Sequence, residues 1–254
     1  MKPHAPILEF DPAPSALIEP SRYHRKIDVA EHCVVTFFQD VIDRLVAAER
    51  LRVVREIPTQ IGKHILYELE VDGRRLALIH PGIGASLAAG LLEVVIARGC
   101  RKFVVCGGAG VLDSSIAAGR AIVLHRALRD EGTSYHYLPP SRLVEASPEA
   151  VAALEAALTE RGLPHTVAQT WTTDAIFRET REKVRRRRAE GCAVVEMEAA
   201  ALFAVARFRG VTIGQAVYAG DDVGGEEHEH RDWTRLSLAR EQLFWAAADA
   251  CLRL

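Results

Sequence analysis

The sequence of 254 residues lacks several features that mark well-known protein classes. It has no CxxC pair among its five cysteines, so a disulfide framework or a zinc site is excluded and buried, reduced thiols are expected. No apolar run approaches the roughly 20 residues of a membrane span. The first ten residues lack the basic and apolar regions of a signal peptide. We therefore expect a cytoplasmic protein without membrane contact.

The sequence also has little net charge. Its 32 basic and 34 acidic residues leave a formal charge of −2, which supplies no electrostatic reason to expect nucleic acid as a partner. One basic cluster, residues 183–188, lies among Glu179, Glu182 and Glu190. We interpret it as the exposed face of a helix in preference to a nucleic-acid patch.

Strand-like and helix-like segments alternate through residues 31–254. A hairpin is predicted at residues 66–80, around Asp72-Gly73. The other expected strands are 33–38, 102–106, 120–125, 165–170, 190–195 and 211–218, and the expected helices are 39–50, 87–98, 148–161 and 240–254. This alternation predicts one α/β domain with three α/β/α layers and a central mixed sheet. Residues 1–30, rich in proline and charge, are expected to form an extended arm.

Two glycine-rich segments, 82–84 and 107–110, follow expected strands. Each is predicted to be a turn whose backbone N–H groups can approach an anion or another ligand. Neither is a P-loop, because no Lys-Ser/Thr pair follows, and Asp113 stands where a dinucleotide fingerprint needs its third glycine. The sequence leaves open whether either turn contacts a ligand.

The most informative motif is Glu196-Met197-Glu198, between an apolar run and a small-residue helix that ends before Gly210. Two carboxylates at the mouth of an apolar element are costly to bury unless a partner or ligand satisfies them. A capped helix start is the alternative, because a glutamate in the first turn complements the helix dipole. The motif therefore predicts either a ligand site or a cap.

Two further segments carry polar groups at the ends of expected strands. Residues 129–140 combine charged groups with three consecutive aromatic rings, which is typical of a functional or interface loop. Asp221 and Asp222 end the late strand just before Gly224. They predict either a catalytic acid or an Asx-type turn.

Together these motifs resemble the nucleoside phosphorylase family, which splits ribosides at the N-glycosidic bond, and most closely its uridine phosphorylase-like branch. The shared order is a Gly-Ile-Gly turn, a strand entering a glycine-rich segment, an Asp-Glu-Gly-Thr-Ser-Tyr-His loop, Glu-Met-Glu, and a late strand ending in Asp. The resemblance implies that Glu198 holds the ribose hydroxyls and that Met197 packs beneath the sugar. It also implies that Asp221 protonates a purine leaving group.

The resemblance further implies a phosphate site, which this sequence retains only in part. Residues 36–41 replace the family's Gly-Asp-Pro loop and contain neither glycine nor arginine. Val105 replaces a second phosphate-binding arginine, and Gly108 replaces a hydroxyl residue. Family membership thus favours inorganic phosphate as co-substrate, whereas the missing guanidinium groups favour water. Thr180 and Glu182 stand near the uracil-reading positions, so uridine phosphorylase itself is not expected.

The sequence therefore predicts a pentosyltransferase or nucleoside hydrolase that cleaves a nucleoside, with a purine-type leaving group favoured, and without cofactor or metal. A non-catalytic nucleoside sensor and a dinucleotide-binding oxidoreductase built on the 107–110 segment are the alternatives. The expected catalytic residues are Asp221 and Glu198, and the expected substrate-binding residues are Met197, Glu196, Phe177, Gly82, Gly84, Gly107, Gly108, Gly110 and His24.

Two expectations concern the surface. Residues 226–230 alternate acids and histidines, and we prefer a mobile lid over the sugar site to a metal site there. In the family, the arm commonly carries a histidine to a neighbouring subunit's sugar site, and His24 is the nearest match. We expect a homodimer or a homohexamer built as a trimer of dimers. The arm would then be ordered by another chain, with residues 135–137 as its docking surface.

Overall fold

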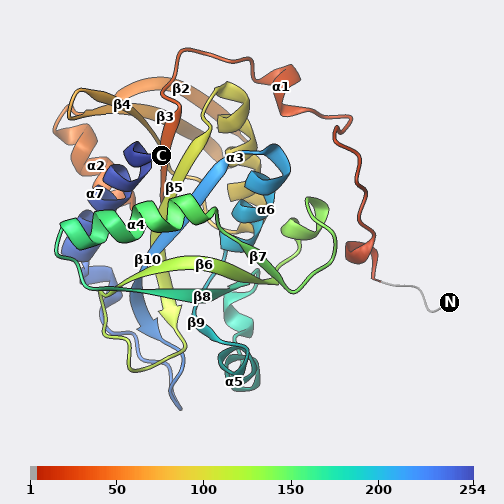
Figure 1. Ribbon diagram of the computed structural model, residues 1–254, viewed down its shortest axis with the longest axis vertical. Helices are drawn as coiled ribbons and strands as arrows, with labels where there is room; N and C mark the ends of the chain where they lie inside the picture. Colours follow the sequence, from red (N-terminus) through yellow and green to blue (C-terminus); the bar gives the residue numbers. More distant parts are fainter. Residues whose placement is uncertain (1–4) are drawn as a thin grey trace.

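The computed structural model describes residues 5–254 and contains one ten-stranded mixed sheet flanked by helices (Figure 1). The strands are β1 (His32–Thr36), β2 (Arg52–Thr59), β3 (Gly62–Val71), β4 (Arg74–Ile79), β5 (Lys102–Val111), β6 (Ala121–Asp130), β7 (Leu143–Glu145), β8 (His165–Thr173), β9 (Cys192–Glu196) and β10 (Thr212–Asp222). The α-helices are α1 (Pro20–Tyr23), α2 (Gln39–Ala47), α3 (Ala85–Arg98), α4 (Pro148–Glu160), α5 (Arg181–Ala189), α6 (Ala199–Arg209) and α7 (Ser237–Arg253). Short 3₁₀ helices are η1 (Pro6–Leu8), η2 (Thr133–His136), η3 (Ile176–Arg178) and η4 (Trp233–Arg235).

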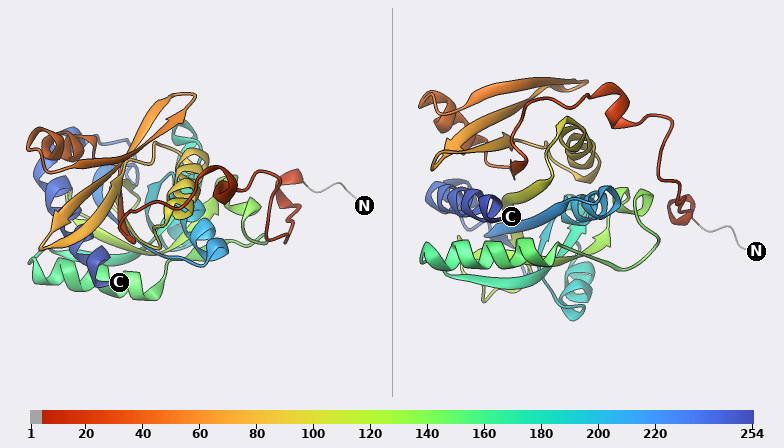
Figure 2. Two further views of the ribbon diagram at one scale, coloured as in Figure 1. Left: turned by 90° about the horizontal axis from the view of Figure 1, so that it is seen from above. Right: turned by 45° about the horizontal axis from the view of Figure 1, so that its top comes forward.

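Strand β5 is the centre of the sheet because three other strands pair with it. It runs parallel to β1 on one side and to β10 on the other, and its last residues pair antiparallel with β9. Strands β9, β8, β6 and β10 are paired in that order, so these four close a ring with β5. Strands β1, β4, β3 and β2 extend from the ring as an open edge (Figure 2).

Helices cover both faces of this sheet. Helices α3 and α6 pack against each other and share one large apolar cluster with the sheet. Helices α4 and α7 pack together over a second cluster, and α2 contacts α7. The predicted α/β class with a central mixed sheet is thus confirmed. No helix within residues 5–254 combines the length and apolar character that a membrane crossing requires.

The predicted hairpin and the second glycine segment had opposite outcomes. Asp72 and Gly73 both have positive φ, 50° and 74°, as a tight turn between β3 and β4 requires. The prediction of a turn at residues 107–110 is wrong, because this segment continues β5 in extended conformation to Val111. The oxidoreductase alternative depended on that turn and loses its structural basis. Strand β2 was not predicted, since it is an exposed edge strand of mixed polar sequence.

The N-terminal segment runs along the outside of the domain (Figure 1, red). Helix α1 lies against α3, and η1 lies against η2 of the same chain. The first four residues of the predicted arm lie outside the described residues. The arm was expected to dock on residues 135–137 of another chain, but in this structure it reaches η2, which includes two of those residues, of its own chain.

Glu68 on β3 joins this segment to the sheet. The carboxylate is only 5% exposed and accepts hydrogen bonds from the Ala30 backbone N–H, from Arg52 and from Arg75. Arg75 also pairs with Asp28 in the arm. Burial favours the neutral acid, but the hydrogen bonds from Arg75, Arg52 and Ala30 outweigh it and lower the pKa of Glu68. Glu68 is therefore a charged anchor.

We expect Glu68→Gln to lower the free energy of unfolding at pH 7 by about 1–3 kcal/mol, because two guanidinium groups lose a buried charged partner. A lowered pKa contributes stability above the unfolded-state value, and this contribution is lost as pH falls toward the folded-state value. The deficit of the variant should therefore shrink below the reference pKa of 4.5. Urea unfolding between pH 3 and pH 7 measures the free energy of unfolding of the wild type and the variant. Glu56→Gln, at an exposed position, is the matched control. Equal losses of stability in Glu68→Gln and Glu56→Gln would contradict the anchoring role of Glu68.

Candidate active site

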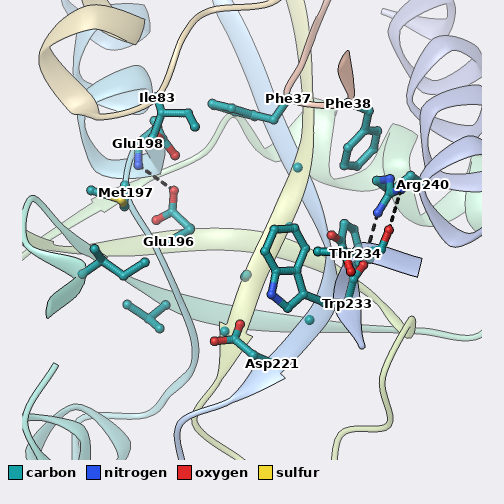
Figure 3. A pocket seen from close by; sticks show the side chains of 18 of the residues that line it. Phe37, Phe38, Ile83, Glu196, Met197, Glu198, Asp221, Trp233, Thr234 and Arg240 are labelled. Carbon is teal, nitrogen blue, oxygen red and sulfur yellow. Dashed lines mark hydrogen bonds between the residues drawn. The ribbon is translucent and has the colours of Figure 1, made fainter. Parts of the chain in front are cut away.

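A cavity of about 520 Å³ opens where β5, β9 and β10 end (Figure 3). In Figure 3, Met197 and Glu198 lie on one side, Thr234 and Arg240 lie on the other, and Asp221 lies apart from both groups. The lining residues are Phe37, Phe38, Gln39, Asp40, Ile83, Gly107, Gly108, Ala109, Gly110, Ile176, Glu179, Val195, Glu196, Met197, Glu198, Gln215, Tyr218, Gly220, Asp221, Trp233, Thr234 and Arg240.

Glu196 ends β9, and its carboxylate is bound within the protein. One oxygen accepts a hydrogen bond of 2.6 Å from the Thr172 hydroxyl and a longer one of 3.3 Å from Thr170. The other accepts from the backbone N–H groups of Glu198 and Ala199, at 2.8 and 2.7 Å. These N–H groups belong to the start of α6 and have no partner within the helix. Glu196 thus fits the capping alternative, and it shapes the turn that presents Met197 and Glu198.

Glu198 is the carboxylate of the motif that faces the cavity. One of its oxygens accepts a hydrogen bond of 2.6 Å from the backbone N–H of Gly84, at the start of α3. Burial, and then the neighbouring charge of Glu196, raise the pKa of Glu198 to about 8, although the Gly84 N–H favours the charged form. The site therefore holds a carboxyl group that ionises near neutral pH and that a ligand bearing hydroxyl groups can stabilise as the anion.

The turn of residues 81–84 delivers the Gly84 N–H to Glu198. Gly82 has a φ of 75°, and a Cβ there would lie 2.2 Å from Leu87, so only glycine fits. The Gly82 N–H donates to His80 Nδ1 at 3.0 Å, which fixes the turn at the end of β4. Gly82 and Gly84 do not line the cavity themselves, and Gly84 acts on it through Glu198.

The glycines of β5 make room for side chains from other parts of the chain. A Cβ on Gly107 would lie 3.0 Å from the Phe37 ring, and one on Gly108 would lie 3.0 Å from the Tyr218 ring. A Cβ on Gly110 would lie 3.4 Å from Asp221 Oδ1. All three glycines line the cavity. Their common role is to leave space, and the cavity shape is set by the rings that face them.

The two aspartates that end β10 have different surroundings. Asp222 is buried, accepts hydrogen bonds from Ser114 and from the Gly224 N–H, and pairs with Arg231. The Asx-turn alternative therefore describes Asp222. Asp221 lines the cavity, and His228 Nε2 lies 2.9 Å from its carboxylate. Asp221 is thus the aspartate that faces a ligand in the cavity.

Glu179 is a cavity-lining carboxyl group that the sequence did not identify. It follows η3, and no side-chain hydrogen bond satisfies its carboxyl group within residues 5–254. Burial, and then the charge of Asp221, raise its pKa to about 7, while His228 and Lys183 partly oppose this. Its sequence signal was weak, since it stands among the charged residues of the basic helix. The fold brings it to the same end of the cavity as Asp221.

Several predicted residues lie elsewhere. The Phe177 ring is 95% exposed and does not reach the cavity, whereas its neighbour Ile176 does. His24 lies at the end of α1 beside Arg98 and outside the cavity, and its role in a neighbouring subunit stays a prediction. The 226–230 loop places His228 on Asp221, and its role as a mobile lid over the sugar site stays a prediction. Within residues 5–254, no group of His, Cys, Asp and Glu is arranged to hold a metal ion.

Aromatic rings occupy the end of the cavity beyond β1. Phe37 and Phe38 stand there together with Tyr218, whose ring centroid is 5.8 Å from that of Phe38. Arg240 is the only basic residue among the lining residues, all of which lie in the described part of the chain. Its Nε lies 3.1 Å from Asp40, and its two terminal nitrogens donate to the carbonyls of Trp233 and Thr234. The guanidinium group is thus bound within the protein.

Comparisons with known proteins show which family the chain resembles. The family model described as the phosphorylase superfamily matches residues 31–250. Guanosine phosphorylase from Halorubrum lacusprofundi is 28% identical over 159 residues, which are 63% of this chain and 66%, just under two thirds, of that protein.

Two solved structures share the fold. Uridine phosphorylase from Vibrio fischeri ES114 has a TM-score of 0.73 at 21% identity, over 88% of this chain and 91% of that one. AMP nucleosidase from Bacteroides thetaiotaomicron VPI-5482 has a TM-score of 0.70 at 20% identity, over 89% of each chain. At these identities the likeness shows the fold alone.

We expect Glu198→Gln to lower turnover of a nucleoside by about 10²-fold or more, because it removes a negative charge that the resemblance to nucleoside phosphorylases places beside the sugar. In the wild type, kcat/KM should rise with pH up to about 8, where the carboxyl group ionises, and this limb should be absent in the variant. Steady-state kinetics from pH 5.5 to 9.5 measures both effects.

The stability of the same variant provides the control for folding. When the pKa of an acid is raised in the folded state, the folded protein disfavours the charged form of that acid. The wild type should therefore lose stability relative to Glu198→Gln as pH rises from about 4.5 to about 8. Activity within threefold of the wild type, with this stability difference present, would rule out a role of Glu198 at the sugar.

Proposed function

The chain belongs to the phosphorylase superfamily, and we propose that within it this protein cleaves the N-glycosidic bond of a purine-type nucleoside with water as the nucleophile. Its relative is named a guanosine phosphorylase, and its structural neighbours are named a uridine phosphorylase and an AMP nucleosidase. All three names describe cleavage of a bond between a ribosyl group and a base. They support the reaction class and include both possible nucleophiles.

The residues at the end of the cavity near β1 are the observation that favours water over phosphate as the nucleophile. Phosphate recognition is strongest with guanidinium groups that bind two oxygens at once. Here Phe37, Phe38 and Tyr218 occupy this end, and the guanidinium of Arg240 is already bound by Asp40 and two carbonyls. A phosphate dianion would have to leave water for a wall of aromatic rings on which the described residues 5–254 offer no free cation. A neutral water molecule meets no such cost.

The sugar and base ends support cleavage of a nucleoside. Ionised Glu198 would accept hydrogen bonds from the ribose hydroxyls and stabilise positive charge as it develops on the sugar, with Met197 beneath the ring. The Asp221–His228 pair would deliver a proton to the leaving base. The electron pair of the broken C1′–N bond then stays on the base nitrogen, and water supplies the new C1′–O bond.

Glu179 supports a purine that offers N–H groups. Its carboxyl group stands beside Asp221 without a hydrogen-bond partner in the described part of the chain. Once ionised, such a group accepts two hydrogen bonds and suits a base edge with two adjacent N–H donors. A purine with one proton-accepting nitrogen and such an edge would engage both carboxyl groups.

We expect the purified protein to convert a purine nucleoside to free base and ribose at a rate that inorganic phosphate changes less than twofold. A panel of purine and pyrimidine nucleosides, with 0 or about 50 mM phosphate, provides the measurement, with free base and ribose 1-phosphate as readouts. Ribose 1-phosphate as the main product would overturn the choice of water. Lack of cleavage of every nucleoside, combined with measurable nucleoside binding, would favour a sensor.

We expect Asp221→Asn to lower kcat/KM for purine nucleosides by about 10²-fold or more, because the leaving base loses its proton donor. A riboside with an activated leaving group, such as 4-nitrophenyl riboside, needs no proton and should lose less than about tenfold. Glu227→Gln is the control, because Glu227 is exposed in the loop that follows β10. Asp222→Asn is unsuitable, because Asp222 holds the adjacent turn through the Gly224 N–H. Equal losses on both substrates would assign Asp221 a structural role.

A further inference from the structure

The turn of residues 81–84 is held by side chains more than by its own backbone. Two of its glycines have positive φ, Gly82 at 75° and Gly84 at 93°, and glycine adopts many other conformations equally well. The only backbone–backbone hydrogen bond of this turn within residues 5–254 runs from the Ala88 N–H to the Gly84 carbonyl. The N–H groups of Gly82 and Gly84 bind two side chains instead, those of His80 and Glu198. These two contacts therefore select the conformation of the turn.

His80 can bind the turn in only one protonation state. The Gly82 N–H donates to His80 Nδ1 at 3.0 Å, so Nδ1 carries no proton and the ring proton of the neutral form lies on Nε2. Burial, and then the neighbouring His64, lower the pKa of His80, and the backbone of Phe37 opposes them only in part. His80 is therefore neutral near pH 8, where Glu198 ionises, and its Nδ1 atom is an acceptor there.

Glu198 depends on the turn through the Gly84 N–H. Burial, and then the charge of Glu196, raise the pKa of Glu198, and Asp174 adds to the rise. Among the contacts that oppose this rise, the 2.6 Å hydrogen bond from Gly84 is the strongest. His80 is neutral in this range and makes no hydrogen bond to Glu198 within residues 5–254. Any effect of His80 on Glu198 therefore passes through the turn.

We propose that Nδ1 of His80, by holding the Gly82 turn, keeps the ionised carboxylate of Glu198 in place and favours that form. The Gly84 N–H is the link between the two side chains. His80 does not line the cavity, so it is a positioning residue and does not touch the substrate. Its effect on turnover rests on the proposed function, in which charged Glu198 stabilises the ribosyl group. Its effect on the ionisation of Glu198 exists without substrate and is measured separately.

Two substitutions of His80 separate the Nδ1 acceptor from the rest of the ring. In His80→Asn the side-chain oxygen is bonded to Cγ, as Nδ1 is, and can accept from the Gly82 N–H. In His80→Gln the amide lies one bond further out, near the place of Nε2, and this acceptor is lost. His165→Gln is the matched control, because His165 is half-buried, also uses its Nδ1 atom in a hydrogen bond, and lies outside the cavity.

The carboxyl titration of Glu198, followed by ¹³C NMR of the whole protein, tests the role without substrate. Glu198→Gln identifies the signal. We expect the midpoint to lie about 1 pH higher in His80→Gln than in the wild type, because the charged form loses a hydrogen bond. It should change by less than about 0.3 pH in His80→Asn and in His165→Gln. An unchanged midpoint in His80→Gln, or equal rises in both His80 variants, would overturn the role of Nδ1.

Imidazole ¹⁵N NMR of the wild type adds a measurement that requires no variant to fold. We expect Nδ1 of His80 to be unprotonated and Nε2 to be protonated from about pH 7 to about pH 9.5. A proton on Nδ1 in this range would exclude the hydrogen bond from Gly82 and overturn the proposal.

Turnover shows whether the positioned charge serves the reaction. We expect kcat/KM for a purine nucleoside at pH 7 to fall about tenfold in His80→Gln, because the ionised fraction of Glu198 falls tenfold when its midpoint rises by about 1 pH. At pH 9.5 the loss should be less than about threefold, since Glu198 is then mostly ionised in both proteins. Equal losses at both pH values would indicate a structural defect and overturn the role. If the wild type cleaves no nucleoside while the midpoints behave as expected, the proposed function fails and the effect of His80 on Glu198 is supported.

Discussion

The burial of two carboxyl groups within one turn is the constraint on which the site depends. Glu196 and Glu198 are separated by a single residue at the start of α6, and both are almost fully buried. Glu196 is accommodated because two hydroxyls and two backbone N–H groups surround it. Glu198 has one N–H, from Gly84, and its pKa is accordingly raised. The protein satisfies the first acid itself and leaves the second to a ligand.

This division of roles connects distant parts of the chain. Gly84 can donate to Glu198 only because the Gly82 turn has a positive φ that other residues rarely adopt. That turn is held by His80, and His80 also packs edge-on against Phe37 at 6.0 Å. The Glu198 end and the Phe37 end of the cavity thus share one support, at the end of β4. A change in either side is transmitted through a short chain of contacts.

The sequence predicted those parts of the molecule that local rules determine. The hairpin at Asp72-Gly73 and the α/β class follow from turn chemistry and from hydrophobic alternation. The 107–110 segment was misassigned because glycine is typical of turns, whereas here the absence of side chains leaves space for Phe37 and Tyr218, which only the fold brings to it. Strand β2 was missed because an exposed edge strand carries no clear apolar alternation.

The residues of the candidate site were likewise predicted only where a local sequence motif contains them. Glu196, Glu198 and Asp221 were found because each belongs to a motif. Glu179 and Gln215 were not, because a single acid in a charged helix entry and a single amide in a strand have no local signature. Their surroundings are set by β5, β8 and β10, which are far apart in sequence. Similarly, Asp221 and Asp222 are equivalent in sequence, and only the partners Ser114 and Arg231 separate them.

The glycine-lined end of β5 has a consequence for how such a site can change over time. Because three of the four residues from 107 to 110 are glycines, the strand carries little side-chain volume there, and its backbone can stay the same while the residues that face it change. The rings of Phe37, just after β1, and Tyr218, on β10, fill the space that the glycines leave. A few substitutions at those facing positions would reshape the cavity without rebuilding the core. The scaffold and the shape of this end of the cavity are thus separable, and the second can evolve at little cost to the first.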